Sequence, residues 1–390
     1  MVRLIDPTVA RRTAAHMETL ERELSAQMAA AVTLLRTVGG TTVTAARARA
    51  STNWWGEEAA RLRLRADAVD MGNACPVPET WGPTISAPDP PRDLVLADLS
   101  KLEERRTLLS THLDLLNGFL RWVPGEPLQS LRSSLTRAVA RLDRAVADRR
   151  AWADRNLLFF DPSGDGRIVE VIGDLKTARH VVVLVPGMGN GLSSYERTLR
   201  VDALRLAERL GDTDTAVVAW LGYDPPDTIV GAISRGPARR GAAALGDFVR
   251  RLGPVHTTVI AHSYGSLVAG LAARQGLLVP DELVFIGSPG VGADNVAELG
   301  LPPSTTVWSG LTLFDPIRLA RPDCMDPSPR CSTDLVFGTD PHGPMFGAKV
   351  FATGEGPLWN AHSAYYRTGS LSLENLAHIA LDEDVVDGRA

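Results

Sequence analysis

Ser263 lies between a run of apolar, β-branched residues and a stretch with helical periodicity, in the segment Val259-Ile260-Ala261-His262-Ser263-Tyr264-Gly265. A serine at a sharp strand-to-helix turn can act as a nucleophile, because the turn exposes its hydroxyl at the C-terminal end of the strand. The turn requires small residues two positions before and two positions after the serine, and these are Ala261 and Gly265 here. We therefore predict that Ser263 is a catalytic nucleophile, with Ala261 where glycine is more common.

A serine hydroxyl needs a neighbouring imidazole to take its proton, and a carboxylate to orient that imidazole. After a turn of this kind the partners follow in the chain order serine, acid, histidine. His362 comes after the last predicted strand and before a helix that begins near Leu371, so it is the predicted base. Two alternatives remain: His342 precedes the last predicted strand, and His378 falls inside the final helix.

The predicted acid is Asp315, which follows the predicted strand at 305–308 and therefore belongs to the same edge of the sheet as Ser263. The alternatives are Asp294, Asp323 and Asp326, and aspartates in such loops more often stabilise turns.

A tetrahedral intermediate also needs N–H donors where its negative charge develops. The segment Val185-Pro186-Gly187-Met188-Gly189-Asn190-Gly191 ends a predicted strand and offers a glycine-rich backbone. We predict that the backbone N–H groups of Met188 and Tyr264 form the oxyanion hole. The catalytic set is thus Ser263, Asp315 and His362.

Two cofactor motifs are incomplete. A dinucleotide loop would need a third glycine where Leu192 stands and an acidic residue after the strand that ends at Trp220. The segment Asp161-Pro162-Ser163-Gly164-Asp165-Gly166 resembles the start of a calcium loop, but the twelfth position is Ile172 instead of glutamate, which indicates a turn. There is no C-x-x-C pair for zinc, so we expect neither a metal nor an organic cofactor.

The second half of the chain alternates strands and helices. Most strands are continuously apolar, which is typical of strands covered by helices on both faces. Strands are predicted at 168–172, 181–185, 215–220, 257–260, 282–286, 305–308 and 349–352, and helices at 195–210, 238–252 and 266–275. This order predicts an α/β fold with a doubly wound, mostly parallel sheet.

The first half has helical periodicity instead. Apolar residues repeat every three or four positions in four segments, the last two marked by leucines from Leu99 to Leu120 and from Leu128 to Leu142. Six prolines between Cys75 and Pro91 exclude a helix there. We therefore predict an all-α domain over residues 1–155, with a proline-rich linker at 75–93, and a catalytic domain over residues 156–390.

Composition excludes several classes of protein. The chain has 390 residues, of which 44% are hydrophobic and 22% charged, as in folded globular proteins. A net charge of -5 argues against a nucleic-acid partner, because such proteins neutralise phosphates with basic side chains. No signal peptide or transmembrane segment is predicted, so the expected compartment is the cytoplasm. In an oxidising compartment Cys324 and Cys331 could form a disulfide, leaving Cys75 free.

The second half resembles a family of actinobacterial α/β-hydrolases long catalogued as a domain of unknown function. The resemblance rests on the matching segments 160–166, 184–188, 261–266, 286–292, 315–317 and 362–363. It implies hydrolysis of the esterase or lipase type, with a small acyl ester or lipid-like substrate. It implies no particular natural substrate.

A second, shorter resemblance concerns Trp54-Trp55-Gly56, which is similar to the Trp-x-Gly hairpin of small substrates of type VII secretion. The Tyr-x-x-x-Asp or Glu signal of those proteins is missing, since no tyrosine precedes Tyr195. Two alternatives to an esterase therefore stay open: a catalytically weak binding or export-associated module, and an acyltransferase.

Overall fold

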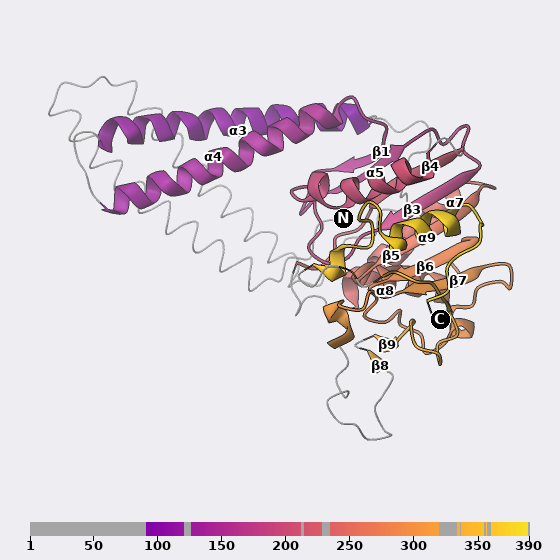
Figure 1. Cartoon of the computed structure of the whole chain (residues 1–390). Coiled ribbons are helices and arrows are strands. Elements are labelled where there is room, and N and C mark those ends of the chain that lie inside the picture. The colour runs from indigo at the N-terminus through magenta and orange to yellow at the C-terminus, as the bar shows by residue number, and fades with distance from the viewer. Residues whose placement is uncertain are drawn as a thin grey trace, which may run out of the picture. The chain divides into compact units, whose positions relative to one another are not determined.

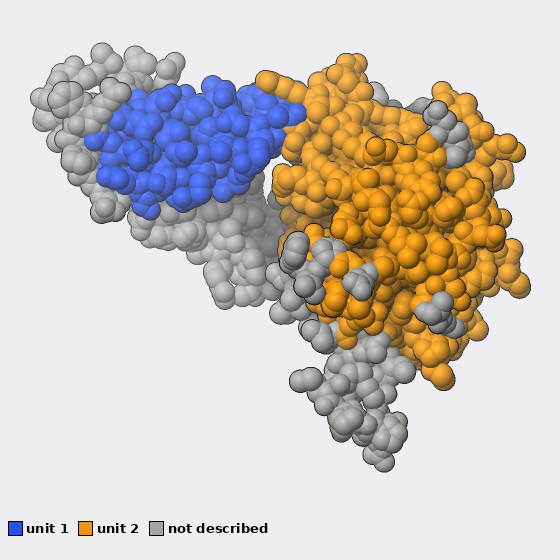
Figure 2. All heavy atoms as spheres, in the orientation of Figure 1, with its two compact units in different colours: residues 1–79, 99–147 blue, residues 80–98, 148–390 orange. Residues whose placement is uncertain are grey.

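The computed structural model describes residues 91–120, 126–211, 214–227, 235–319, 334–335, 337–354, 356 and 360–388. The chain divides into two compact units, residues 1–79 with 99–147 and residues 80–98 with 148–390 (Figure 2). The first predicted helix pair, Trp54-Trp55-Gly56 and the cysteines Cys75, Cys324 and Cys331 lie outside the described residues. The division into domains at residue 155 stays a prediction.

Two long helices, α3 (Pro91–Leu120) and α4 (Glu126–Trp152), correspond to the last two helical segments predicted from leucine spacing (Figure 1). Proline is well suited to the first position of α3, where its missing N–H has no helical partner. Ion pairs between Arg106 and Asp143 (2.8 Å) and between Arg149 and Asp98 (2.9 Å) join the two helices. Asp98 precedes Arg106 in α3, whereas its partner Arg149 follows Asp143 in α4, so the two helices are antiparallel.

The second unit is built on an eight-stranded sheet with the order β1-β2-β4-β3-β5-β6-β7-β10. Its strands are β1 (Leu157–Asp161), β2 (Arg167–Ile172), β3 (His180–Val185), β4 (Thr215–Leu221), β5 (His256–His262), β6 (Glu282–Ile286), β7 (Thr306–Gly310) and β10 (Lys349–Val350). The neighbours from β4 to β10 are parallel, whereas β1 and β2 are antiparallel additions at one edge. The predicted mostly parallel sheet is confirmed.

Helices cover both faces of this sheet. They are α5 (Leu199–Leu210), α7 (Gly236–Arg251), α8 (Tyr264–Arg274) and α9 (Leu371–Ala380). In β3, Val181, Val183 and Val185 pack with residues of α7 and α8, while Val182 and Leu184 pack with residues of α5 and α9. Because successive side chains of a strand point to opposite faces, only a continuously apolar strand can serve both cores.

Three differences from the predicted elements concern short segments. The strand β1 and the two-stranded sheet of β8 (Asp334–Leu335) and β9 (Gly338–Thr339) were not predicted. The helix predicted from Tyr195 is instead a 3-10 turn, η1 (Tyr195–Arg197), followed by α5. The two are separated at Thr198, whose ψ of -101° is not helical. Further 3-10 turns are η2 (Val296–Leu299), η3 (Pro316–Leu319) and η4 (Ala361–Ser363).

The parallel strands end at a common edge. Pairing aligns Val185 at the end of β3 with Ala261, His262 at the end of β5 with Ile286, and Ile286 with Gly310 at the end of β7. The loops that leave these strands therefore start side by side, although they are far apart along the chain.

Candidate active site

Ser263 occupies a tight turn between β5, which ends at His262, and α8, which begins at Tyr264. Its φ of 53° and ψ of -126° lie in a region that residues other than glycine rarely adopt. Such strain is retained where the surrounding structure imposes it, and here the strand and the helix fix both ends of the turn. The turn has the geometry expected of a nucleophile elbow.

The small residues predicted on either side of Ser263 lie in closely packed surroundings. A β-carbon at Gly265 would lie 2.7 Å from the carbonyl oxygen of Val185 and 2.8 Å from that of Pro186. Ala261 is fully buried, and its carbonyl oxygen accepts a hydrogen bond of 3.0 Å from the Ser266 hydroxyl. The helix can therefore begin this close to β3 only because Gly265 has no side chain.

The three predicted catalytic side chains meet in one chain of hydrogen bonds. The Nε2 atom of His362 lies 2.8 Å from Oγ of Ser263, and its Nδ1 atom lies 2.8 Å and 3.0 Å from the two carboxylate oxygens of Asp315. His362 belongs to η4, and Asp315 precedes η3 beyond the end of β7. His362 is thus hydrogen-bonded to a residue 99 positions away and to another 47 positions away. The distances would allow proton transfer from Ser263 and orientation of the ring by Asp315.

The alternative residues make other contacts. His378 pairs through Nδ1 with Glu383 at 2.8 Å, and the backbone N–H of His342 donates to the Asp340 carboxylate in a turn. The backbone N–H of Asp294 donates to a carboxylate oxygen of Glu298. Asp323 and Asp326 lie outside the described residues.

Asp315 is buried and strongly hydrogen-bonded. Burial alone would raise the pKa of its carboxyl group, but hydrogen bonds from His362, from the Tyr365 hydroxyl (2.6 Å) and from the Ile317 N–H (2.8 Å) stabilise the carboxylate more, so its pKa lies below the ordinary value. An ionised Asp315 favours the tautomer of His362 that carries its proton on Nδ1. That tautomer leaves Nε2 as an acceptor for the Ser263 hydroxyl.

Tyr365 is a member of the site that the sequence did not reveal. Its hydroxyl also accepts a 3.3 Å hydrogen bond from the Thr312 N–H, so Tyr365 contacts two residues of the loop after β7, Thr312 and Asp315. Burial, together with the charge of Asp315, raises the pKa of Tyr365 well above its ordinary value, which keeps the phenol a donor. Its position three residues after His362 was the only available signal.

Gly287 is a second such residue. Its φ is 54°, and a β-carbon there would lie 3.0 Å from Oδ2 of Asp315 and 3.2 Å from Cε1 of His362. Glycine is therefore needed both for the backbone and for the space beside Asp315 and His362. The available signal was its place at the end of a predicted strand.

His262 packs against His362 and contacts its backbone. Its Nε2 atom lies 2.6 Å from the backbone carbonyl oxygen of His362, and the two rings are 4.8 Å apart. Burial, with a further contribution from the nearby imidazole of His362, lowers the pKa of His262 to about 3. The ring is thus neutral near pH 7, and the carbonyl acceptor requires its proton to be on Nε2.

The loop after β3, residues 186–194 and here called the Gly187 loop, passes directly against the serine. A β-carbon at Gly187 would lie 2.6 Å from Cβ of Ser263 and 3.1 Å from its Oγ. The N–H of Gly189 donates to the Pro226 carbonyl oxygen, so it is already paired. Met188 lies between these two glycines, and Tyr264 is the first residue of α8. The roles of Met188 and Tyr264 in the oxyanion hole stay a prediction.

Among the described residues, no group of three or more histidines, cysteines, aspartates or glutamates could hold a metal ion. In the same part of the chain, no helix has both the length and the hydropathy needed to cross a membrane.

The family match to known proteins lies in the second half of the chain. A family model described as alpha/beta hydrolase matches residues 161–324. An uncharacterized protein of Mycobacterium tuberculosis is 31% identical over 253 residues, which cover 57% of this chain and 39% of that protein. An uncharacterized protein of Mycobacterium bovis is 34% identical over 184 residues, covering 40% of this chain and 69% of that protein. The chain thus spans 39% of the length of the first of these relatives.

One similar solved structure is that of a predicted CIB-like hydrolase from Thermoplasma acidophilum. It has 13% sequence identity and a TM-score of 0.34, and the match covers 58% of this chain and 96% of that one. A likeness of this degree identifies no substrate.

Proposed function

Because this chain belongs to the alpha/beta hydrolase family, we propose that it hydrolyses carboxylic esters through Ser263, His362 and Asp315. The observation that carries the proposal is the continuous hydrogen-bond chain from the Ser263 hydroxyl through the imidazole of His362 to the buried carboxylate of Asp315. Each of the three groups has the partner that its proposed role requires. The substrate class is a small acyl ester or a lipid-like ester.

The first half of the proposed reaction forms an acyl-enzyme. Oγ of Ser263 attacks the ester carbonyl carbon while its proton moves to Nε2 of His362. The carbonyl oxygen gains the negative charge and is bound by the backbone N–H groups of Met188 and Tyr264. When the intermediate collapses, the bond to the alkoxide breaks, and His362 donates its proton so that an alcohol leaves.

The second half returns the enzyme to its starting state. His362 removes a proton from a water molecule, and the resulting hydroxide attacks the acyl carbon. Collapse of the second intermediate breaks the bond to Oγ of Ser263, which regains its proton from His362. A carboxylic acid leaves, and the proposed cycle uses no metal and no organic cofactor.

The test combines a covalent probe with turnover. A fluorophosphonate should label Ser263, and nitrophenyl esters of increasing chain length should be hydrolysed. Ser263→Ala should lose both activities while remaining folded. Absence of labelling and turnover in the folded wild-type protein would instead indicate a binding or export-associated module. Formation of a new ester when an alcohol is added would indicate an acyltransferase.

A further inference from the structure

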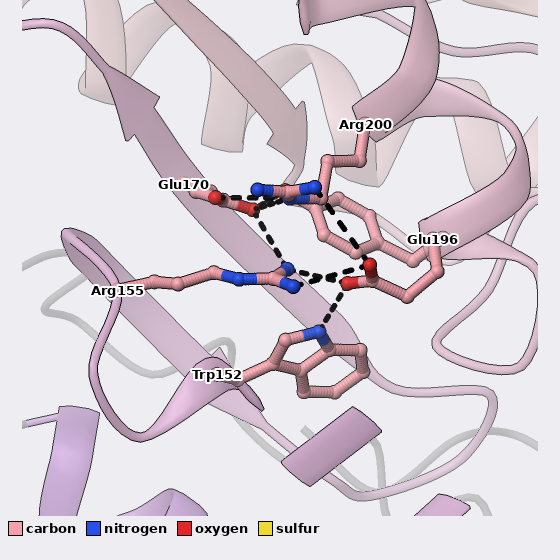
Figure 3. Close-up of polar contacts among 6 residues, drawn as sticks. Trp152, Arg155, Glu170, Glu196 and Arg200 are labelled. Atoms are coloured by element: carbon pink, nitrogen blue, oxygen red, sulfur yellow. Dashed lines mark hydrogen bonds and ion pairs between the residues drawn. The ribbon is translucent and has the colours of Figure 1, made fainter. Parts of the chain in front are cut away.

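Six residues outside the triad form a partly buried polar network, here called the charge cluster (Figure 3). They come from the end of α4, from the segment before β1, from β2, and from η1 and α5. The members are Trp152, Arg155, Glu170, Tyr195, Glu196 and Arg200. Two guanidinium groups face two carboxylates, so their formal charges balance.

Glu170 is the more buried of the two carboxylates, with 4% of its side chain exposed. It accepts hydrogen bonds from the Tyr195 hydroxyl at 2.7 Å and from Nε of Arg200 at 3.1 Å. Arg155 adds an ion pair at 3.6 Å. Glu170 thus holds the first residue of η1 and the second residue of α5 against the sheet.

Glu196, the second carboxylate, is bound by Arg155 and Trp152. Arg155 donates to both of its carboxylate oxygens, the longer bond being 3.2 Å, and the indole N–H of Trp152 donates to one of them. Burial raises the pKa of Glu196, but the hydrogen bonds from Arg155 and Trp152 outweigh that effect and leave the pKa below its ordinary value. Glu196 is therefore a carboxylate near pH 7 and keeps both bonds.

Stability alone does not account for such a cluster. Well-packed apolar side chains of similar volume are often as stabilising as a buried ion pair, or more so. Forked bonds between a guanidinium and a carboxylate do fix the direction and spacing of the groups they join. What the charge cluster fixes is the position of residues 195–200 relative to β2 and the end of α4.

Residues 195–200 continue directly from the Gly187 loop, which has no helix or strand of its own to fix it. Within the loop, the side-chain amide of Asn190 donates to the Gly187 carbonyl oxygen at 3.1 Å. The Thr198 hydroxyl in turn donates to Oδ1 of Asn190 at 2.9 Å. Asn190 thus connects the residue beside Ser263 to the segment that the charge cluster holds.

The turn between β1 and β2 borders the middle of the same loop. The Leu192 N–H donates to the Asp165 carbonyl oxygen at 2.9 Å, and a β-carbon at Gly191 would lie 3.1 Å from that oxygen. This turn belongs to the segment that resembles an incomplete calcium loop. The turn thus contacts the middle of the Gly187 loop, whereas the end of the loop at Ser194 is followed directly by Tyr195 and Glu196 of the charge cluster.

We propose that the charge cluster positions the Gly187 loop, and with it the backbone N–H of Met188, against the nucleophile. Arg155, Glu170 and Glu196 are positioning residues and touch no reacting atom. The inference rests on the proposed function for its catalytic consequence, because the N–H of Met188 matters only if an oxyanion forms there. The positioning itself is independent of turnover.

The experiment compares Glu196→Gln and Trp152→Phe with the matched control Glu374→Gln. Glu374 lies on α9 and pairs with Arg209 in the last turn of α5, so the control removes a carboxylate that contacts the opposite end of α5. Amide hydrogen exchange over residues 186–194 is measured for each full-length protein, together with kcat and KM on a nitrophenyl ester. Rates are expressed per fluorophosphonate-titrated site.

In Glu196→Gln we expect faster exchange in the Gly187 loop and a fall in kcat of about 10- to 100-fold with KM within about twofold, because small displacements of catalytic groups have costs of this order. Trp152→Phe keeps every charge and loses one donor, so it should change both quantities in the same direction by less. It remains informative if Glu196→Gln does not fold. Glu374→Gln should leave both unchanged.

Unchanged loop exchange and unchanged kcat in a folded Glu196→Gln or Trp152→Phe protein would overturn the inference. Lower melting temperature with unchanged kcat and unchanged loop exchange would do the same, because it would indicate a structural role only. If the wild-type protein hydrolyses no ester but the variants still exchange faster over residues 186–194, the proposed function fails while the positioning of the loop stands.

Discussion

The hydroxyl of Tyr365 donates a 2.6 Å hydrogen bond to Oδ2 of Asp315, the carboxylate that also lies 2.8 Å through Oδ1 from Nδ1 of His362. The acid thus has two neutral donors besides the imidazole, since the Ile317 N–H reaches it as well. These bonds keep the carboxylate ionised although it is buried, and they fix the plane in which it meets the imidazole. The orientation of the His362 imidazole therefore depends in part on the Tyr365 hydroxyl, which reaches it through Asp315.

Tyr365→Phe should reduce kcat by about 10- to 100-fold. A hydrogen bond to a charged group contributes about 1.5–3 kcal/mol, and 1.36 kcal/mol corresponds to a factor of ten in rate. The matched control is Tyr366→Phe, which removes the hydroxyl of the adjacent buried tyrosine, whose pKa is raised by burial and by the charge of Asp202. Steady-state kinetics on a nitrophenyl ester would contradict the expectation if both variants lost activity equally.

Gly287→Ala should reduce kcat because the new methyl group would lie 3.0 Å from Oδ2 of Asp315 and 3.2 Å from Cε1 of His362. A suitable control is Gly276→Ala, at a φ of 67° with no atom within 4 Å of the added carbon. Both changes place alanine at positive φ and should lower the free energy of unfolding by about 1–2 kcal/mol. Only Gly287→Ala should also lower kcat per folded molecule, and equal kcat in the two variants would contradict the crowding argument.

His262→Gln should flatten the dependence of stability on pH in the acidic range. The folded-state pKa of His262 is about 3, below its ordinary value of 6.5. Between these values the unfolded chain binds the proton and the folded chain does not, so His262 makes the fold less stable as pH falls from about 6.5 towards 3. Glutamine keeps an N–H donor and does not titrate. Urea unfolding between pH 6 and 4 should give the wild-type protein a slope steeper by about 1.4 kcal/mol per pH unit.

Equal slopes for wild type and His262→Gln would show that His262 is protonated in the folded protein. His378→Gln is the control, because this histidine pairs with Glu383 near the surface. The free energy of unfolding of His378→Gln should therefore depend on pH as steeply as that of the wild-type protein between about pH 6 and 4.

Ser263→Gly should be more stable than Ser263→Ala by about 1 kcal/mol. Both variants lack the hydroxyl and should lose about 10⁵-fold or more in kcat, as expected when the nucleophile of a triad is removed. They differ in backbone freedom, since a φ of 53° with a ψ of -126° strains any residue with a β-carbon. Chemical unfolding compares the two proteins, and a Ser263→Ala protein more stable than Ser263→Gly would contradict the expectation.

Much of the fold was predictable because it depends on periodicity over a few neighbouring residues. Continuously apolar runs marked β3 and β4, and leucine spacing marked α3 and α4. The strand β1 was not predicted: its apolar run, Leu157 to Phe160, follows α4 after only four residues, and only its antiparallel pairing with β2 makes it a strand.

The sequence by itself determined the strand–serine–helix turn, because that turn is local, and the order of serine, acid and histidine along the chain narrowed the partners of Ser263 to a few aspartates and histidines. The tertiary structure decided that Asp315 and His362 meet Ser263. Only the tertiary structure decided what supports them. Tyr365 and Gly287 act across contacts that exist once the ends of β6 and β7 lie side by side, and Glu196 meets Arg155 only after β2 and α5 pack together. Such contacts join residues tens of positions apart, and no spacing along the chain encodes them.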